Sequence, residues 1–341
     1  MVPRRATPRY SIVIPLFNEA EVLPALLARM DSLLGGLDGP AEVIFVDDGS
    51  ADSTAAQVRA KAAADSRYRL VELSRNFGHQ AAITAGMDVA AGQAVIVMDA
   101  DLQDPPEVVY DLAAKWREGF QVVYAQRTSR DGETAFKRWT AHLFYQGLRR
   151  VASIDLVPNV GDFRLVDRKV LDAFRAMPER DRFVRGMFGW LGFRQAVVPF
   201  ARAPRAAGTT KYPLWKMIRL AVAGLVGFSD APLRLALWLG MTVSTLALIY
   251  GAYVLIAALG GDRSLVAGWA STIVIVSFLC GLNMMLTGVV GLYVGRIHAE
   301  VKGRPLYVVN DKVGFEGASP EAAAPQSVSE QQERLARYAA G

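Results

Sequence analysis

The chain has 341 residues, 52% of them hydrophobic, and a formal net charge of +5 at pH 7. This length accommodates an α/β domain of about 200 residues and a further part. The single cysteine, Cys280, excludes a disulfide-bonded framework. The basic residues gather beside two apolar runs without any nucleic-acid recognition motif, so we expect a lipid surface and no nucleic acid as partner.

In the first 206 residues, short apolar runs typical of strands alternate with segments of helical periodicity. We expect residues 1–9 to form a flexible basic segment, and they lack the apolar core of a signal peptide. Short runs rich in β-branched residues predict strands over residues 10–16, 41–46, 68–73, 94–98 and 121–125. Helical patterns lie between them, at about residues 19–34, 53–64, 78–90 and 107–118. The alternation predicts an α/β fold with a mostly parallel sheet, which binds ligands beyond the carboxyl ends of its strands.

Acidic side chains follow the strand predicted at 94–98. Asp99 and Asp101 are two residues apart, so both can face one side of the strand end, and Pro105-Pro106 stops the pairing. Carboxylate oxygens with room left for phosphate suit Mg²⁺ or Mn²⁺ when the ion carries a diphosphate. We predict Asp101 as the best metal ligand and Asp99 as its partner. For an isolated Asp-x-Asp, a solvated acidic turn is the alternative.

Other polar residues at the strand ends allow separate roles. The Asp48 carboxylate can accept hydrogen bonds from a base or a ribose, although a helix cap is an alternative. Gln103 can add a neutral oxygen ligand or bind a sugar hydroxyl. Asn76 and His79 are ambiguous, and zinc is disfavoured there because neither a cysteine nor a second histidine is near in sequence.

The second half of the chain predicts a membrane anchor. Residues 235–259 and 265–295 contain no charged residue, and each run exceeds the roughly 20 residues that cross a bilayer as a helix. We therefore predict transmembrane helices at about 233–259 and 266–295, within a hairpin spanning 233–296. Two buried core helices are the alternative.

The flanks of this hairpin predict its orientation. Lysine and arginine precede and follow it, whereas the connecting loop has Arg263 balanced by Asp262. Positive residues stay in the cytoplasm, so we expect a multi-pass inner-membrane protein with the large domain and both termini cytoplasmic. Glycines in the second run permit a homo-oligomer, a dimer or tetramer.

The segments on either side of the hairpin have their own patterns. In 207–232, Lys216 and Arg219 lie three residues apart among apolar side chains, which predicts an amphipathic helix in the headgroup layer. A linker helix packed on the domain is the alternative. The C-terminal segment 297–341 is expected to be cytoplasmic, and disordered from about residue 317, where polar residues lack periodicity.

Seven motifs in order carry a resemblance that covers roughly residues 10–310. They are SIVIPLFNE from Ser11, VDDGS from Val46, RNFGH from Arg75, MDADLQDPP from Met98, GDFRL from Gly161, ERDRFVRG from Glu179 and TTKYP from Thr209. The chain resembles the family 2 glycosyltransferases of the GT-A type. More narrowly, it is similar to the polyprenyl-phosphate glycosyltransferases, which include dolichol-phosphate mannose synthase and the bacterial undecaprenyl-phosphate glucosyltransferases.

The resemblance implies a GT-A, Rossmann-like catalytic domain at 10–206 and a role for each matching residue. The catalytic residues would be Asp99 and Asp101, which hold Mg or Mn and the sugar diphosphate, and Asp162 near the transferred sugar. The nucleotide sugar would contact Pro15, Asn18, Glu19, Asp48 and Gln103. The acceptor phosphate would contact Arg127, Lys137, Arg138 and Arg164. Gln126 stands where relatives commonly have a small residue, so the assignment of Arg127 carries over from the resemblance but the fine shape of the pocket does not.

The acceptor chemistry fits these cations. A lipid monophosphate has a second pKa near 6, so its oxygen is already nucleophilic at cytoplasmic pH and a base such as Asp162 is optional. Cations are needed to orient it against the donor diphosphate. We expect an inverting glycosyltransferase that moves a sugar from a nucleotide diphosphate sugar to polyprenyl phosphate, with UDP-sugars favoured and GDP-mannose possible.

Two rival functions remain. A processive polysaccharide synthase of the same superfamily is disfavoured because its Gln-x-x-Arg-Trp signature is absent from the sequence. A non-catalytic membrane scaffold that retains a nucleotide-binding fold is the other alternative.

Overall fold

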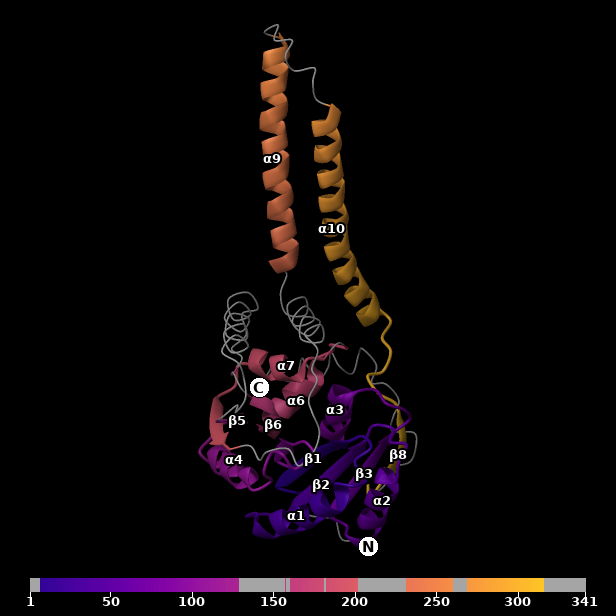
Figure 1. The fold of residues 1–341 in the computed structure, drawn as a ribbon. Helices are drawn as coiled ribbons and strands as arrows, with labels where there is room; N and C mark the ends of the chain where they lie inside the picture. Colours follow the sequence, from indigo (N-terminus) through magenta and orange to yellow (C-terminus); the bar gives the residue numbers. More distant parts are fainter. Residues whose placement is uncertain are drawn as a thin grey trace. The chain divides into compact units, whose positions relative to one another are not determined.

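The computed structural model describes residues 7–128, 157, 160–180, 182–201, 231–259 and 269–315 (Figure 1). The chain divides into two compact units. The first comprises residues 1–149, 154–210 and 304–341, and the second comprises residues 150–153 and 211–303. Lys137, Arg138 and most of the predicted amphipathic segment 207–232 lie outside the described residues.

The first unit is built on a sheet that has eight strands in the described part of the chain, in the order β7-β5-β6-β4-β1-β2-β3-β8. The central pairs β1–β2, β1–β4 and β2–β3 are parallel, whereas β6 is antiparallel to β4 and β5, and β8 is antiparallel to β3. The strands are β1 (Tyr10–Leu16), β2 (Ala41–Asp47), β3 (Tyr68–Leu73), β4 (Ala94–Val97), β5 (Val122–Arg127), β6 (Val160–Asp167), β7 (Gln195–Phe200) and β8 (Val309–Val313).

Helices cover both faces of this sheet, which is why the central strands are almost continuously apolar (Figure 1). The face that carries Ile12 and Ile14 packs in one core with α1, α2 and α4. The opposite face presents Val13 and Val46 to α3. The helices of this unit with described bounds are α1 (Leu23–Gly36), α2 (Thr54–Ala64), α3 (His79–Val89), α4 (Val108–Arg117), α6 (Arg168–Ala176) and α7 (Val184–Trp190).

The predicted α/β fold with a mostly parallel sheet is confirmed. The strands predicted at 10–16 and 68–73 coincide with β1 and β3, and the bounds of β2, β4 and β5 differ from prediction by one or two residues. The sequence analysis missed β8, in the segment assigned to the C-terminal tail. Its residues Asn310, Asp311 and Lys312 have low strand propensity, and its partner β3 is far away in sequence. This strand therefore forms because it pairs with β3 in the folded protein, and not because of its local sequence.

The second unit contains two long helices, α9 (Ala231–Leu259) and α10 (Trp269–Val301), which contact each other. Both contain a segment long and apolar enough to cross a membrane, Leu233–Tyr253 and Phe278–Val301, each with mean hydropathy 1.7. None of either window is buried within the protein, unlike the core helix of a soluble domain. Two apolar helices near the C-terminus were predicted and are confirmed.

Candidate active site

A cavity of about 380 Å³ opens at the carboxyl ends of β1, β2 and β4. The sheet order reverses between β1 and β4, and ligands of open α/β sheets bind at such a reversal. The residues that line it are Pro15, Leu16, Phe17, Glu19, Asp48, Asn76, Gly78, His79, Ala82, Asp99, Ala100 and Asp101. The fold therefore brings together five residues with predicted roles, namely Pro15, Glu19, Asp48, Asp99 and Asp101.

Asp48 holds the loop that follows β3. Its two carboxylate oxygens accept the backbone N–H groups of Phe77, at 2.7 Å, and Gly78, at 2.9 Å. Gly78 has φ +100°, a conformation that glycine adopts without strain. Asp48 thus fixes the residues from which α3 begins, and it also lines the cavity. Its contact with a base or ribose stays a prediction.

Asn18 and Gln103 make local contacts and are not among the cavity-lining residues. Asn18, at φ +55°, accepts the Ala51 N–H through Oδ1 at 2.8 Å and donates its own backbone N–H to Ser50 Oγ at 2.9 Å. These bonds join the loop after β1 to the loop after β2. The backbone N–H of Gln103 donates to Asp101 Oδ1 at 3.1 Å.

Four carboxylates line the cavity, those of Glu19, Asp48, Asp99 and Asp101. Burial, followed by the charges of Asp101, Asp52 and Asp99, raises the pKa of Glu19. Burial also raises the pKa of Asp99, and neighbouring carboxylates add to this while His79 opposes it. Such a site concentrates negative charge that a divalent cation offsets.

The donor set fits a hard divalent ion. Asp99 Oδ1 is buried and has no hydrogen-bond partner among the described residues, as expected of an oxygen reserved for a cation. The described residues hold no group of three or more His, Cys, Asp and Glu side chains placed to bind a metal. Mg²⁺ commonly uses one or two protein carboxylates together with substrate phosphates, so Asp99 and Asp101 are sufficient for that mode.

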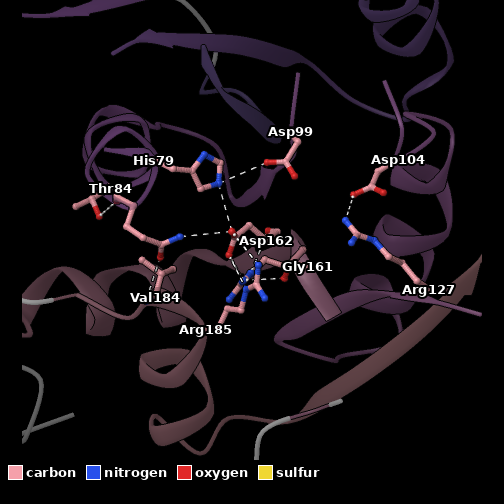
Figure 2. A network of polar contacts seen from close by, with 11 residues as sticks. His79, Thr84, Asp99, Asp104, Arg127, Gly161, Asp162, Val184 and Arg185 are labelled. Atoms are coloured by element: carbon pink, nitrogen blue, oxygen red, sulfur yellow. Dashed lines mark hydrogen bonds and ion pairs between the residues drawn. The ribbon is translucent and has the colours of Figure 1, made fainter. Parts of the chain in front are cut away.

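Asp162 is buried at the centre of a polar cluster beside this cavity (Figure 2). Its Oδ1 accepts from Arg164 at 2.9 Å and from Arg185 Nε at 3.0 Å. Its Oδ2 lies 3.2 Å from His79 Nε2 and also accepts from Gln80 at 3.4 Å. Burial disfavours the charge, but the His79 hydrogen bond and the two arginines outweigh it and hold the pKa of Asp162 well below its usual range.

Arg164 is buried inside the domain, with 1% of its side chain exposed. It donates to the carbonyls of Asp162 and Gly161, at 3.1 Å each, and lies over the rings of Tyr124 and Phe188. Its described contacts are therefore with the protein interior.

Arg127 stands at the end of β5, apart from the Asp162 cluster (Figure 2). Its Nη2 donates to Asp104 Oδ2 at 3.1 Å, and Asp104 is almost fully buried. The side chain of Arg127 is 24% exposed, so it retains some access to solvent.

Sequence reasoning missed Arg185 and left His79 without a role. Arg185 lies in the ERDRFVRG motif that supported the resemblance, but the motif alone does not say which residue it contacts. The contact with Asp162 depends on α7 packing beside β6, which no local pattern reveals.

Comparison with known proteins agrees with this geometry. The sequence profile of Glycosyl transferase family 2 matches residues 11–175. This match identifies the protein as a glycosyltransferase. The mostly parallel α/β sheet and the acidic cavity at its strand ends agree with that class.

The chain belongs to glycosyltransferase family 2, as the sequence predicted. It is 45% identical over 308 residues to an uncharacterised glycosyltransferase, YkcC, of Bacillus subtilis strain 168, covering 90% of this chain and 95% of that protein. It is 38% identical over 301 residues to the SfII prophage-derived bactoprenol glucosyl transferase of Shigella flexneri, covering 88% and 97%.

Among solved structures, glucosyl-3-phosphoglycerate synthase from Mycobacterium tuberculosis, in complex with Mn²⁺, UDP-glucose and phosphoglyceric acid, matches with a TM-score of 0.43 and 22% identity. The match covers 64% of this chain and 79% of that one.

Proposed function

We propose that the protein transfers a hexose from a nucleotide diphosphate sugar to the phosphate of a polyprenyl phosphate at the cytoplasmic leaflet. The observation that carries this proposal is the cavity at the β1–β4 reversal, with Asp48 on one side and Asp99 and Asp101 on the other. Relatives named bactoprenol glucosyl transferase, similar over most of their length, support a lipid acceptor and the transfer of a hexose. For the donor we favour a UDP-sugar, as the resemblance implies.

The donor would lie along this cavity. Pro15, Glu19 and Asp48 line the part we assign to the nucleotide, and Asn18 shapes its wall through the loop after β2. Asp101 and Asp99 would hold Mg²⁺ or Mn²⁺, with Gln103 beside them. The bound ion would stabilise the departing diphosphate.

The acceptor would be oriented by arginine and lysine rather than activated by a base. We assign Arg127 to the acceptor phosphate, together with Lys137 and Arg138. Asp162 is a weak base because its pKa is lowered, which agrees with a nucleophile that is already deprotonated. Arg164 was expected at the acceptor phosphate, but its buried contacts favour a role in holding Asp162.

The transfer itself is a single displacement. A phosphate oxygen of the acceptor forms a bond to the anomeric carbon as the bond from that carbon to the diphosphate oxygen breaks. Attack from the face opposite the leaving group inverts the anomeric configuration. The protein contributes orientation and charge stabilisation.

The second unit would anchor the enzyme where the acceptor resides. We propose that α9 and α10 span the inner membrane, that segment 207–232 lies in the headgroup layer, and that both termini are cytoplasmic. Exposed leucine, isoleucine and valine side chains along both helices support contact with lipid. Glycines on α10 leave room for a homo-oligomer through the membrane helices.

The test uses purified full-length protein in nanodiscs with undecaprenyl phosphate, Mn²⁺ and radiolabelled nucleotide sugars. We expect label from UDP-glucose or a related UDP-sugar to enter the organic phase, and mass spectrometry of the lipid to show one added hexose. Folded protein that transfers no sugar from any nucleotide donor overturns the proposal and favours the membrane scaffold.

A further inference from the structure

We propose that His79 is a positioning residue that orients the Asp99 carboxylate, and that Asp162 and Arg185 hold its imidazole for this purpose. The inference rests on the proposed function, because it concerns how the site prepares one of the two carboxylates assigned to the metal. It gives roles to two residues, His79 and Arg185, that the sequence analysis left without one.

The imidazole bridges two carboxylates (Figure 2). His79 Nε2 lies 3.2 Å from Asp162 Oδ2 and 3.5 Å from Asp99 Oδ1. That Asp99 oxygen is buried and accepts no hydrogen bond from the described part of the chain. The contact with His79 Nε2 therefore restrains this oxygen without a hydrogen bond, and it leaves the oxygen available for a cation.

Arg185 fixes the other side of the bridge. Its Nε and Nη2 contact the two oxygens of Asp162, at 3.0 and 3.2 Å, in the planar fork that suits a carboxylate. Arg164 adds a third contact from β6 at 2.9 Å. With 6% of its side chain exposed, Asp162 is held in one orientation by two elements, so its Oδ2 stays directed at His79.

The backbone of His79 is also restrained. His79 is the first residue of α3, and Gly78 before it donates its N–H to Asp48 at 2.9 Å. A chain of contacts thus runs from Asp48, in the part of the cavity assigned to the nucleotide, through His79 to Asp99. Both ends of the donor site are tied to the start of one helix.

Residues that orient a metal-binding side chain affect metal affinity without contacting the ion, commonly by 10- to 100-fold. We therefore expect His79→Ala to weaken Mn²⁺ binding in the presence of UDP by about 10- to 100-fold. UDP binding without Mn²⁺ should change little. His79→Gln should recover part of the affinity, because its amide N–H reaches a similar position.

The experiment measures Mn²⁺ binding to full-length protein in micelles by isothermal titration calorimetry, with saturating UDP, and transfer kinetics in parallel. Arg185→Met should weaken Mn²⁺ binding in the same direction, and Arg185→Lys should do so less. The matched control is Lys61→Met on α2, which removes an ion pair to Asp31 of α1 and should leave Mn²⁺ affinity unchanged.

Wild-type affinity in folded His79→Ala and His79→Gln overturns this inference. The elution volume on size exclusion and the melting temperature report whether each variant is folded, and His79→Gln and Arg185→Lys keep the test decisive if the alanine variant does not fold. Wild-type protein that binds neither Mn²⁺ nor UDP instead overturns the proposed function itself.

Discussion

Asp99 and Asp101 are separated by one residue, yet their surroundings differ. Asp99 faces His79 and keeps one buried oxygen without a hydrogen bond in the described chain, whereas Asp101 accepts the backbone N–H of Gln103. The two carboxylates therefore line the same cavity with differently restrained side chains. Both can contribute to one ion without being equivalent.

Asp101→Asn keeps the shape of the side chain and removes its charge. Because loss of a metal-binding carboxylate removes several kcal/mol of stabilisation of the departing diphosphate, we expect transfer to fall on the order of 1,000-fold. The check is the initial rate at saturating donor, acceptor and Mn²⁺. Asp111→Asn on α4 is the control, and a variant at position 101 that retains more than about a tenth of the rate contradicts the metal assignment.

Arg127 offers a separable test of acceptor binding. Arg127→Lys keeps a positive charge beside the buried Asp104 but loses the planar fork that binds phosphate through two donors. We expect the KM for polyprenyl phosphate to rise about 10-fold, with the KM for the nucleotide sugar unchanged. Arg117→Lys, at an exposed ion pair with Asp38, is the control. An unchanged acceptor KM removes Arg127 from this role.

At the scale of elements, the close packing of α3 on the sheet determines where His79 lies. A Cβ atom on Gly86 would come within 3.0 Å of side-chain atoms of Val13 and Val46. The glycine therefore allows the helix that begins at His79 to approach β1 and β2 closely.

Gly86→Ala should force α3 away from the sheet. We expect a loss of about 1–3 kcal/mol, which lowers Tm by roughly 2–10 °C. Differential scanning fluorimetry of the protein in micelles measures the change. Gly35→Ala on α1, where a Cβ meets nothing within 4 Å, should be neutral or slightly stabilising. Equal Tm values for both variants contradict the close packing.

The start of β1 is joined to the turn after α1 by a buried tyrosine. Tyr10 donates to Asp38 Oδ1 at 2.7 Å, and its ring packs edge-on against Trp116 of α4. Burial, followed by the hydrogen bond to Asp38, raises the pKa of Tyr10 from 10 to about 12. The protonated phenol is therefore favoured in the folded state.

Because the folded pKa is raised, Tyr10 contributes its stability below the unfolded pKa and loses it as pH rises toward the folded one. Wild-type protein should exceed Tyr10→Phe in Tm at about pH 8, and the difference should shrink between about pH 10 and pH 12. Thermal unfolding of both proteins across that range provides the measurement. A constant difference contradicts the shift.

For the whole molecule, the charge pattern around the apolar helices predicts topology. Lysine and arginine flank both outer ends, and the connecting loop at 260–264 carries one positive and one negative residue. The positive-inside rule then places this loop outside the cytoplasm. This prediction concerns orientation in a membrane, independently of the chemistry in the cavity.

Cysteine labelling in intact spheroplasts tests the orientation. With Cys280→Ser as background, a membrane-impermeant maleimide should label Asp262→Cys readily and Ser319→Cys only after lysis, because the bilayer shields cytoplasmic residues. Labelling of both positions after lysis is the control for accessibility. Labelling of Ser319→Cys before lysis contradicts the proposed topology.

Local pattern is sufficient for much of this protein. The β-branched runs and helical periodicities predicted β1 to β5 and their order along the chain, since propensity and amphipathicity act over a few residues. The rule that parallel sheets bind ligands at their carboxyl ends then predicted that Asp48, Asp99 and Asp101 converge. The absence of charge over two long runs likewise predicted α9 and α10.

Tertiary packing decided the features that depend on distant partners. β8 exists because β3 offers an open edge, although its own residues disfavour a strand. Arg164 contacts the interior, and His79 and Arg185 meet at Asp162, only because β6, α3 and α7 pack together. His79 and Asp162 are 83 positions apart, and the paired residues Leu70 and Val313 of β3 and β8 are 243 apart. The geometry of such contacts arises from burial and close packing, for which one-dimensional spacing contains no signal.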